Sequence, residues 1–599
     1  MSKNWIIRLL LLVCTMVLAT PLWSQSLLTN IEGRNFISLD GKWEFILDPF
    51  DAGNSSWKSI WKDQHPEGKT DFYEYQFNAA LTLNVPADWN SQRPELRYYE
   101  GTVWYKKSFQ FQKKAGNRIF IYFAGVNYTC DVFLNNKKIG SHEGGFTAFQ
   151  FEVTDKINTG TNEVIVRVNN QRRAEGIPAL NFDWWNYGGV TRDVYLAETP
   201  TTYISDYFIQ LDKENPSKIG GYIQLAGDLP GRKVSVRIPE LNINFHGLTN
   251  EQGKSVVLIA AKPQLWSPER PKLYDVTIAA DEDSIHEAIG FRSIEVKGTD
   301  ILLNGSSVFL KGINIHEEIP QRAARATSET DCRQLLGWAK ELGCNFVRLT
   351  HYPHNEHMVR LADKMGILLW EEIPLWQGIE FSNPIILDKA NRLLDEMIAR
   401  DKNRCSIILW SLSNETSPSQ SRNETLSAMA AHARSVDPTR LITSAFNHIK
   451  YEKNQVTIDD SLCKALDVIA INEYIGWYSP WPARPEEMQW NSPFNKPLIM
   501  SEFGAEALFG NHGSADTASS WSEEYQEQVF IDQLTMLKKI SFLRGMTPWI
   551  LADFRSPSRM HPVYQQGWNR KGLLSDQGLR KKAWYVLFNY YREVRTQKN

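Results

Sequence analysis

The pattern of hydrophobic and polar positions changes twice along the chain, and each change predicts a different kind of domain. Between residues 26 and 198, short apolar or alternating runs are separated by turn residues such as Asn135-Asn136, as is typical of antiparallel sheets. The clearest runs are Arg118–Phe123, Thr129–Leu134 and Glu163–Val168. Their regular spacing predicts a β jelly-roll sandwich over residues 26–198.

Residues 199–296 repeat this style in a shorter unit. Val234–Ile238 alternates apolar and polar residues, as does Leu273–Ile278. About one hundred residues of short strands are typical of an immunoglobulin-like β-sandwich. We therefore predict a second, smaller sandwich after the first.

From about Lys297 to residue 599, apolar runs alternate with helical stretches, of which Glu329 to Leu342 and Lys389 to Arg400 are the clearest. Eight such runs in about 300 residues predict a catalytic (β/α)8 TIM barrel. Pro548 has no backbone N–H to give to a sheet, which leaves the limits of the last strand open. The candidate strands are Val308–Gly312, Asn345–Leu349, Ile367–Trp370, Ile407–Trp410, Leu441–Ser444, Val468–Ile471, Leu498–Met500 and Thr547–Leu551.

The first 25 residues have the layout of a signal peptide. Lys3 and Arg8 make a positive start, and Leu9 to Ala19 is apolar but too short to span a bilayer comfortably. Cleavage is expected between about Thr20 and Ser26. We therefore expect an exported protein, periplasmic or secreted, with no membrane contact once the signal is removed.

Composition narrows the class of partner. The net charge is −3 without a long basic run, so nucleic acid is not an expected partner. Aromatic residues reach 12%, with 21 Trp, which suits stacking on sugar faces as well as a Trp-rich core. The five cysteines after the signal peptide are sparse and lack CxxC spacing, so neither a disulfide framework nor a zinc site is expected. We predict no metal and no cofactor.

Many of the predicted barrel strands run directly into polar side chains. Strand four ends in Asn414-Glu415 and strand seven in Ser501-Glu502, about two or three βα units later. The carboxyl ends of barrel strands meet at one mouth, and two facing carboxylates are what glycosidic bond cleavage needs. An isolated glutamate at a strand end is more often a salt-bridge partner. We therefore interpret Glu371, Glu372 and Glu473 as structural residues.

The order of the motifs resembles glycoside hydrolase family 2, which combines a jelly-roll sugar-binding domain, an immunoglobulin-like sandwich and a barrel. Within that family, the chain length favours the β-glucuronidase group over the much longer β-galactosidases. The motifs that carry the resemblance are Trp104–Phe109, Asn181–Gly189, Trp266–Pro268, Gly290–Arg292, Arg348–Pro353, Asn414-Glu415 and Ser501–Gly504.

The resemblance implies a retaining mechanism, with Glu415 as general acid/base and Glu502 as nucleophile about 5–5.5 Å apart. It also implies that Asn414 binds the sugar 2-hydroxyl and that Tyr474 orients the nucleophile. Further substrate contacts implied in the same way are Asp183 and His351 on sugar hydroxyls, Asn472, and Trp549 as the floor of the pocket.

A motif near the C-terminus points to the kind of sugar. By resemblance to glucuronidases, Asn569 and Lys571 grip the carboxylate of a uronic acid. The chemistry agrees, because a permanent cation beside an amide donor suits a carboxylate. Beside a neutral hydroxymethyl group, the cation would lose its solvation without gaining an ion pair. Glucuronidases often place an arginine a few residues earlier, where this chain has Tyr564–Gln566. Arg555 or Arg559 is the candidate replacement, unless the uronic acid is bound differently.

The leading hypothesis is an exported, exo-acting β-glucuronidase that removes terminal glucuronic acid from an oligosaccharide or glycoconjugate. A β-galactosidase or another neutral-sugar hydrolase of the same family is the alternative within this class. A non-catalytic carbohydrate-binding protein is the alternative from another class, disfavoured because both glutamates are present. A homo-oligomer is left open.

Overall fold

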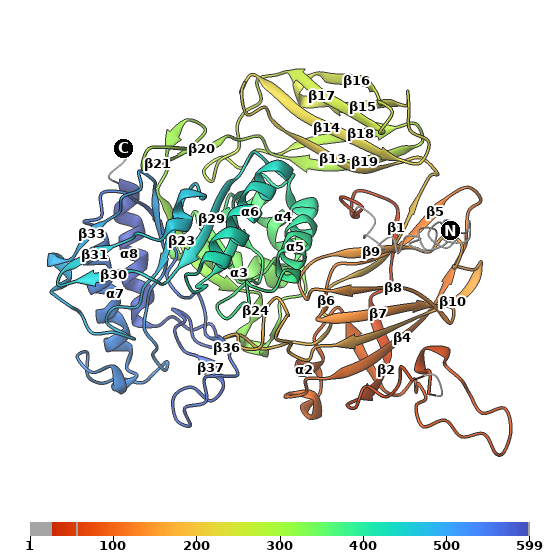
Figure 1. The fold of residues 1–599 in the computed structure, drawn as a ribbon, viewed down its shortest axis with the longest axis horizontal. Helices are drawn as coiled ribbons and strands as arrows, with labels where there is room; N and C mark the ends of the chain where they lie inside the picture. The colour runs from red at the N-terminus through yellow and green to blue at the C-terminus, as the bar shows by residue number, and fades with distance from the viewer. Residues whose placement is uncertain (1–26, 56–57, 597–599) are drawn as a thin grey trace, which may run out of the picture.

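The computed structural model describes residues 27–55 and 58–596, and the predicted signal peptide lies outside them. Figure 1 shows a β-sandwich built from the first part of the chain, a smaller sandwich above it, and a barrel beside both. The predicted fold class is confirmed. The limits given above for the domains stay predictions.

The front sandwich consists of two antiparallel sheets. Thr129–Leu134 and Lys137–Glu143 form a hairpin around the predicted turn, in which Asn135 and Asn136 adopt φ of 50° and 63°. The six-stranded sheet runs in the order β3-β2-β4-β10-β7-β8, with strands Thr82–Val85, Gly41–Asp48, Thr102–Phe111, Gly160–Asn169, Thr129–Leu134 and Lys137–Glu143. The four-stranded sheet runs β1-β12-β5-β9, with strands Phe36–Ser38, Val194–Thr199, Arg118–Phe123 and Phe149–Glu152.

The second sandwich packs a three-stranded sheet on a four-stranded one. Alternation decides which side chains enter the core: Val234, Val236 and Ile238 are buried, and the residues between them are not. One sheet is β13-β14-β17 (Tyr203–Leu211, Lys218–Ala226, Lys254–Ala260). The other is β16-β15-β18-β19 (Ile243–Leu248, Lys233–Ile238, Tyr274–Ala280, Asp283–Ile289).

The barrel closes from eight strands, each of which pairs parallel with both of its neighbours. Most of their residues are buried on both faces, which explains why they appear in the sequence as continuous apolar runs. The strands are β23 Leu310–His316, β26 Phe346–Thr350, β27 Leu368–Glu372, β28 Ile407–Asn414, β29 Leu441–Phe446, β32 Ile469–Asn472, β34 Leu498–Glu502 and β35 Leu543–Met546.

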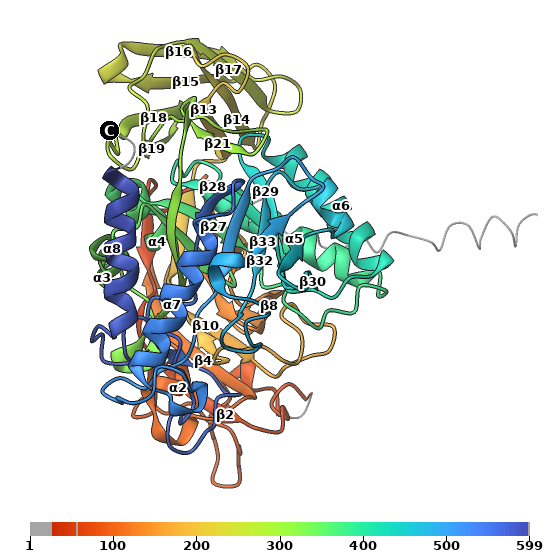
Figure 2. The ribbon, with the colours of Figure 1, turned by 90° about the vertical axis from the view of Figure 1, so that its left-hand side faces the viewer.

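Helices cover the outside of the barrel. The helix predicted at 329–342 has those bounds, since Ser328 caps its first turn by accepting from Asp331 N and Gly343 ends it at φ 95°. Figure 2 faces the side away from the front sandwich and shows α7 and α8 there. The helices are α3 Glu329–Leu342, α4 Glu356–Met365, α5 Ile385–Asp401, α6 Gln420–Val436, α7 Glu523–Leu537 and α8 Lys582–Thr596.

Two barrel connections lack the expected α-helix in the described part of the chain. After β29 and after β32 the chain forms 3-10 turns and a small sheet, β30-β31-β33 (Lys450–Glu452, Gln455–Thr457, Gln489–Asn491). The strict alternation of strands and helices predicted from the sequence therefore fails there. The residues between β29 and β30 border the pocket described below.

The eighth barrel strand was predicted wrongly at 547–551. It is Leu543–Met546, which pairs with Leu310–His316 on one side and Leu498–Glu502 on the other. Arg544 and Gly545 break its apolar run, so the pattern gives no strand signal. Pro548 has no N–H to donate, but the apolar segment around it still bonds to both neighbours, through Thr547 N to Met500 O and Asn314 N to Pro548 O. Asn314 Nδ2 also donates to the carbonyls of Ser501, Thr547 and Pro548.

The front sandwich reaches across to the barrel. Arg192 is fully buried and pairs with Glu317 at 3.0 Å, and Trp185 N donates to Arg555 O at 3.0 Å. These contacts place the loop that contains Asp183 at the mouth of the barrel. Among the helices of the described residues, none has the length and apolar character needed to cross a membrane.

Candidate active site

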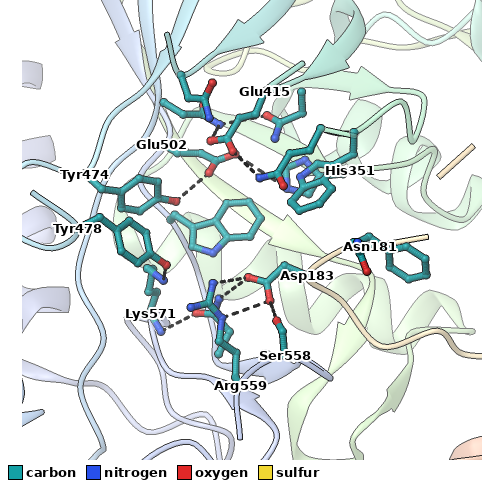
Figure 3. A pocket seen from close by; sticks show the side chains of 18 of the residues that line it. Asn181, Asp183, His351, Glu415, Tyr474, Tyr478, Glu502, Ser558, Arg559 and Lys571 are labelled. Carbon is teal, nitrogen blue, oxygen red and sulfur yellow. Dashed lines mark hydrogen bonds and ion pairs between the residues drawn. The ribbon is translucent and has the colours of Figure 1, made fainter. Parts of the chain in front are cut away.

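A pocket of about 960 Å³ opens at the carboxyl ends of the barrel strands. Its walls come from these strand ends and, on one side, from the front sandwich through residues 181–183 (Figure 3). Every site residue predicted from the sequence lines it: Asp183, His351, Asn414, Glu415, Asn472, Tyr474, Glu502, Trp549, Asn569 and Lys571. The fold therefore brings together residues that are widely separated along the chain.

Glu502 ends β34 and receives two strong donors. Arg348 Nη1 donates to its Oε1 at 2.9 Å, and the hydroxyl of Tyr474 donates to its Oε2 at 2.8 Å. The pKa of Glu502 is raised to about 8. Burial is the largest cause; the charge of Arg348 and the bond from Tyr474 lower the pKa, and the charge of Glu415 raises it. Both donors stabilise the anionic form, which is the form a nucleophile needs.

Arg348 is held in place by a buried network. It donates to Glu372 from Nε at 3.2 Å and from Nη2 at 3.1 Å, and to Asn414 Oδ1 at 2.7 Å. The charge of Arg348 overcomes the effect of burial and lowers the pKa of Glu372. Glu372 is thus a salt-bridge partner, as expected from the sequence, but its partner is the arginine that contacts Glu502.

His351 lies between this network and the pocket. Its Nδ1 is 2.8 Å from Glu372 Oε1, and its ring stacks on Trp549 with centroids 4.9 Å apart. Burial lowers the pKa of His351 despite the neighbouring carboxylate, so the ring is neutral near pH 7. The Nδ1–H group then donates a hydrogen bond to Glu372, and Nε2 is free to accept a hydrogen bond from a ligand hydroxyl.

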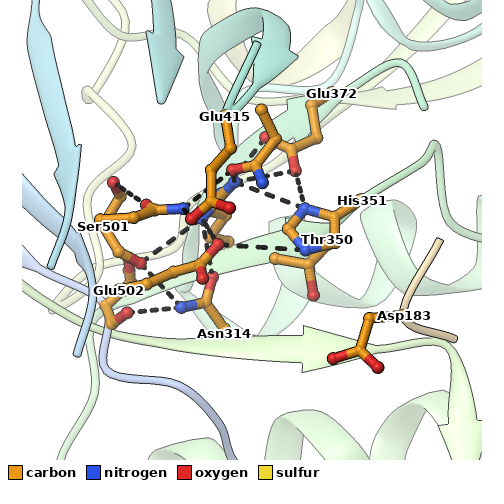
Figure 4. Close-up of polar contacts among 12 residues, drawn as sticks. Asp183, Asn314, Thr350, His351, Glu372, Glu415, Ser501 and Glu502 are labelled. Carbon is orange, nitrogen blue, oxygen red and sulfur yellow. Dashed lines mark hydrogen bonds and ion pairs between the residues drawn. The ribbon is translucent and has the colours of Figure 1, made fainter. Parts of the chain in front are cut away.

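Glu415 follows β28 and lies opposite Glu502 in Figure 4. Its backbone has φ 54°, a left-handed conformation that is uncommon for a glutamate. Its two oxygens accept from neutral amides, Asn472 Nδ2 at 2.8 Å and Gln377 Nε2 at 2.9 Å. Asn472 is itself oriented by Ser501, whose hydroxyl donates to its Oδ1 at 2.6 Å.

The two carboxylates therefore have different surroundings. A guanidinium and a phenol donate to Glu502, which favours its anionic form against the effect of burial, whereas neutral amides hold Glu415, which is in no ion pair with a cation there. Pairs of carboxyl groups with unlike environments divide into a nucleophile and an acid/base in this way.

A second polar cluster lies on the side of the pocket near the front sandwich (Figure 3). Asp183 pairs with Arg559 at 2.7 Å and accepts from Asn569 Nδ2 at 3.1 Å. Lys571 pairs with the buried Glu506 at 3.3 Å and donates to the hydroxyl of Tyr478 at 2.7 Å. Asn569 and Lys571 thus lie in the same pocket as the two glutamates, as the sequence motif implied.

The two candidate arginines have different positions. Arg559 lines the pocket. Arg555 does not; its guanidinium packs 4.5 Å from the ring of Trp185 and 5.2 Å from that of Trp568. Of the two, only Arg559 is in a position to meet a ligand.

Several residues of the site have no signal in the sequence. Gln377 and Glu506 follow strand ends in loops without periodicity, and Tyr478 lies in the loop after β32. Gln377 has φ 45°, but this is visible only in the structure. Among the described residues, no group of three or more His, Cys, Asp or Glu is placed to hold a metal ion.

Comparison with known proteins gives a consistent picture. Family models described as glycosyl hydrolases family 2 match residues 36–200 (sugar binding domain), 202–292 and 294–577 (TIM barrel domain). A beta-glucuronidase of Paenibacillus borealis is 28% identical over 616 residues, covering 94% of this chain and 97% of that protein. The human beta-glucuronidase is 26% identical and covers 94% of this chain and 91% of that one.

Solved structures resemble the whole chain. A beta-glucuronidase of Ruminococcus gnavus superposes with a TM-score of 0.80 at 25% identity, covering 95% of this chain and all of that one. A family 2 beta-galacturonidase from Eisenbergiella tayi, bound to galacturonate, gives 0.78 at 26% identity over 94% of this chain and 98% of that one. Together the three family models span nearly all of the described residues, and the chain is a glycosidase that belongs to glycoside hydrolase family 2.

Proposed function

We propose that this chain is a retaining, exo-acting β-glucuronidase. One observation carries the proposal: the two unlike carboxylates, Glu415 and Glu502, share a pocket with the Asn569–Lys571 pair. The chemistry of cleavage and the chemistry that distinguishes a uronic acid are thus within reach of one sugar ring. The names of the relatives support it.

The reaction follows from the geometry in two steps. Glu502 attacks the anomeric carbon while Glu415 gives its proton to the leaving oxygen, so the aglycone departs as an alcohol and the sugar is esterified to Glu502. Glu415, now an anion, removes a proton from water, whose oxygen attacks the same carbon and frees Glu502. Arg348 and Tyr474 stabilise Glu502 as it leaves, and Asn414, held by Arg348, is available to the 2-hydroxyl.

A β-galacturonidase is the second candidate, because a relative of that name has nearly the same structural similarity. Glucuronate and galacturonate differ only in the configuration at C4, and both present a carboxylate to Lys571. We further propose, from the signal-like N-terminus, that the enzyme is exported and acts on oligosaccharides or glycoconjugates outside the cytoplasm.

A panel of p-nitrophenyl β-glycosides tests the function: glucuronide, galacturonide, glucoside, galactoside, mannoside and xyloside. A uronide is expected to react on the order of 10²-fold or more faster, in kcat/KM, than the matched neutral glycoside, as a site built around a charged pair discriminates. Glu502→Gln is the control for contaminating glycosidases. Preference for a neutral galactoside would reject the proposal while leaving the two-glutamate mechanism.

Lys571→Ala tests the carboxylate contact within this panel. Removing one partner of a desolvated ion pair costs roughly 2–5 kcal/mol, so kcat/KM on the glucuronide should fall about 30- to several-thousand-fold. The matched glucoside lacks the carboxylate, and its rate should change little. Equal losses on the two substrates would mean that Lys571 has only a structural role.

A further inference from the structure

Arg559 lies between two acids at the edge of the pocket, in the loop between β36 (Phe554–Arg555) and β37 (Trp568–Asn569). Its Nε donates to Asp183 Oδ1 at 3.2 Å and its Nη2 to Asp183 Oδ2 at 2.7 Å. Nη1 lies 3.5 Å from Glu506 Oε1. The arginine is thus held along one edge by Asp183 and at one corner by Glu506.

Two N–H donors are left over on Arg559. A guanidinium has five N–H groups, and the side edge, Nε with Nη2, is taken by Asp183. A third N–H, on Nη1, is turned toward Glu506. One N–H on Nη1 and one on Nη2 remain. These donors are available to a carboxylate, and the side chain borders the pocket with 23% of its surface exposed.

Asp183 has little acceptor capacity left for a sugar hydroxyl. Its Oδ1 accepts from Arg559 and from the hydroxyls of Ser556 and Ser558, and its Oδ2 accepts from Arg559 and Asn569. Five bonds from four residues converge on this one carboxylate. The direct contact between Asp183 and substrate hydroxyls that the resemblance implies would require some of these bonds to break.

Lys571 and Arg559 converge on the same oxygen. Glu506 Oε1 lies 3.3 Å from Lys571 Nζ and 3.5 Å from Arg559 Nη1, and Glu506 is only 1% exposed. The two cations therefore lie side by side with a buried anion behind them. Asp183 and Glu506 balance both charges, so the cluster is neutral before a ligand binds and can be desolvated without an unpaired charge.

We propose that Arg559 is a specificity-determining residue that grips the carboxylate of the sugar with its remaining N–H donors, next to Lys571, and that Asp183 is the residue that positions it. This inference rests on the proposed function. Arg559 would take the role of the arginine that glucuronidases often have a few residues before the Asn-x-Lys motif and that this chain lacks there. Arginine adds shape to charge, because its planar fork fits a flat carboxylate, whereas lysine acts as a point charge.

The first test compares Arg559→Lys and Arg559→Ala on p-nitrophenyl glucuronide and glucoside. Arg559→Ala is expected to lower kcat/KM on the glucuronide about 30- to 1,000-fold and on the glucoside no more than a few-fold. Arg559→Lys keeps the charge but loses the fork, so it should recover only part of the loss. Added guanidinium should partly restore Arg559→Ala on the glucuronide alone, which a purely structural role would not produce.

Arg555→Lys is the matched control, because this arginine ends the strand before the same loop but packs on tryptophans outside the pocket. It should leave the ratio of glucuronide to glucoside activity at the wild-type value. If Arg559→Ala also leaves that ratio unchanged, the inference is overturned.

The second test addresses Asp183. If it positions Arg559, Asp183→Asn should lower the glucuronide-to-glucoside ratio, and adding it to Arg559→Ala should lower the ratio no further, giving a non-additive double-mutant cycle. If Asp183 instead binds a hydroxyl shared by both sugars, Asp183→Asn slows both substrates alike and adds fully to Arg559→Ala. That result would refute the positioning role.

The wild-type panel distinguishes failure of the proposed function from failure of the role given to Arg559. A wild-type enzyme that prefers uronides, together with an Arg559→Ala variant of unchanged preference, rejects only the role of Arg559. A wild-type enzyme that prefers a neutral sugar rejects the proposed function itself. Two measurements on Arg559→Ala distinguish a lost contact from a lost structure. Calorimetry should show weaker binding of D-glucuronic acid, and the thermal midpoint should stay near that of the wild type.

Discussion

At the scale of single residues, the site is governed by what faces each carboxylate. Glu502 accepts from Arg348 and Tyr474, whereas Glu415 accepts from the amides of Asn472 and Gln377. A neighbouring cation stabilises the ionised form of a carboxyl group, whereas an amide can hydrogen-bond to the ionised or the protonated form. This difference supports Glu502 as nucleophile and Glu415 as acid/base.

Glu415→Ala should separate these roles. With the acid gone, kcat/KM on substrates with poor leaving groups is expected to fall by about 10²–10⁴-fold, and good leaving groups should suffer less. Azide needs no general base, so adding it should speed turnover of the glycosyl-enzyme and yield a β-glycosyl azide. Unchanged activity of the variant on an oligosaccharide would exclude the assignment.

Tyr474→Phe should change the pH dependence. The hydrogen bond from Tyr474 lowers the pKa of Glu502, which is nonetheless raised to about 8, with burial as the largest cause. Losing that bond raises the pKa further, so the nucleophile becomes an anion only at higher pH. The acid limb of kcat/KM should therefore move to higher pH. Tyr478→Phe is the control: Tyr478 contacts Lys571 rather than Glu502, and the acid limb should stay in place.

At the scale of elements, the seam of the barrel next to Pro548 is held by a side chain in addition to backbone hydrogen bonds. Asn314 Nδ2 donates to Ser501 O at 2.8 Å, Thr547 O at 2.5 Å and Pro548 O at 3.2 Å. One amide thereby ties the strand that ends in Glu502 to the segment that supplies Trp549.

Asn314→Ala should weaken this seam and the site together. It removes one donor from each of three buried carbonyls, of which those of Ser501 and Pro548 keep another, and this costs roughly 2–4 kcal/mol of unfolding free energy. Because Glu502 and Trp549 both lose support, activity should fall on glucuronide and glucoside by similar factors. Denaturant unfolding and the substrate pair measure the two effects. Full stability with full activity would show that the backbone alone closes the barrel.

At the scale of the whole molecule, buried ion pairs connect the two sandwiches to the barrel. Glu287, from the immunoglobulin-like sandwich, pairs with Arg360 of α4 at 2.9 Å and with Arg404 at 2.8 Å. Burial alone would raise the pKa of Glu287, but the charges of the two arginines prevail and lower it to about 2.

Glu287→Gln should therefore destabilise the protein in a pH-dependent way. A folded-state pKa below the ordinary value of 4.5 means that the ionised group stabilises the fold above pH 4.5 and that this contribution is lost as the pH falls toward 2. The shift corresponds to about 3 kcal/mol. The gap in thermal midpoint between wild type and variant should be widest near pH 6–7 and shrink toward pH 3. A gap that does not depend on pH would contradict the charge pairing.

The fold class, and the position of Glu415 and Glu502 at the ends of barrel strands, could be predicted from the sequence. Strand and helix patterns are local, since a strand buried on both faces must be apolar throughout, and the polar residues where such strands end lie at the mouth of the barrel. Glu415 and Glu502 could be found because each directly follows such a run. The eighth strand could not, because Arg544 and Gly545 interrupt its apolar run.

The tertiary structure alone decided how the rest of the site is assembled. Asp183 and Arg559 belong to different domains, and their ion pair exists only because the front sandwich docks on the barrel mouth. Glu506 and Gln377 lie in loops, whose side chains obey no periodicity and acquire a role only from the groups that the fold brings to them. The reason is physical: the local pattern records which residues are buried, whereas the pairing of charges depends on distances that folding sets.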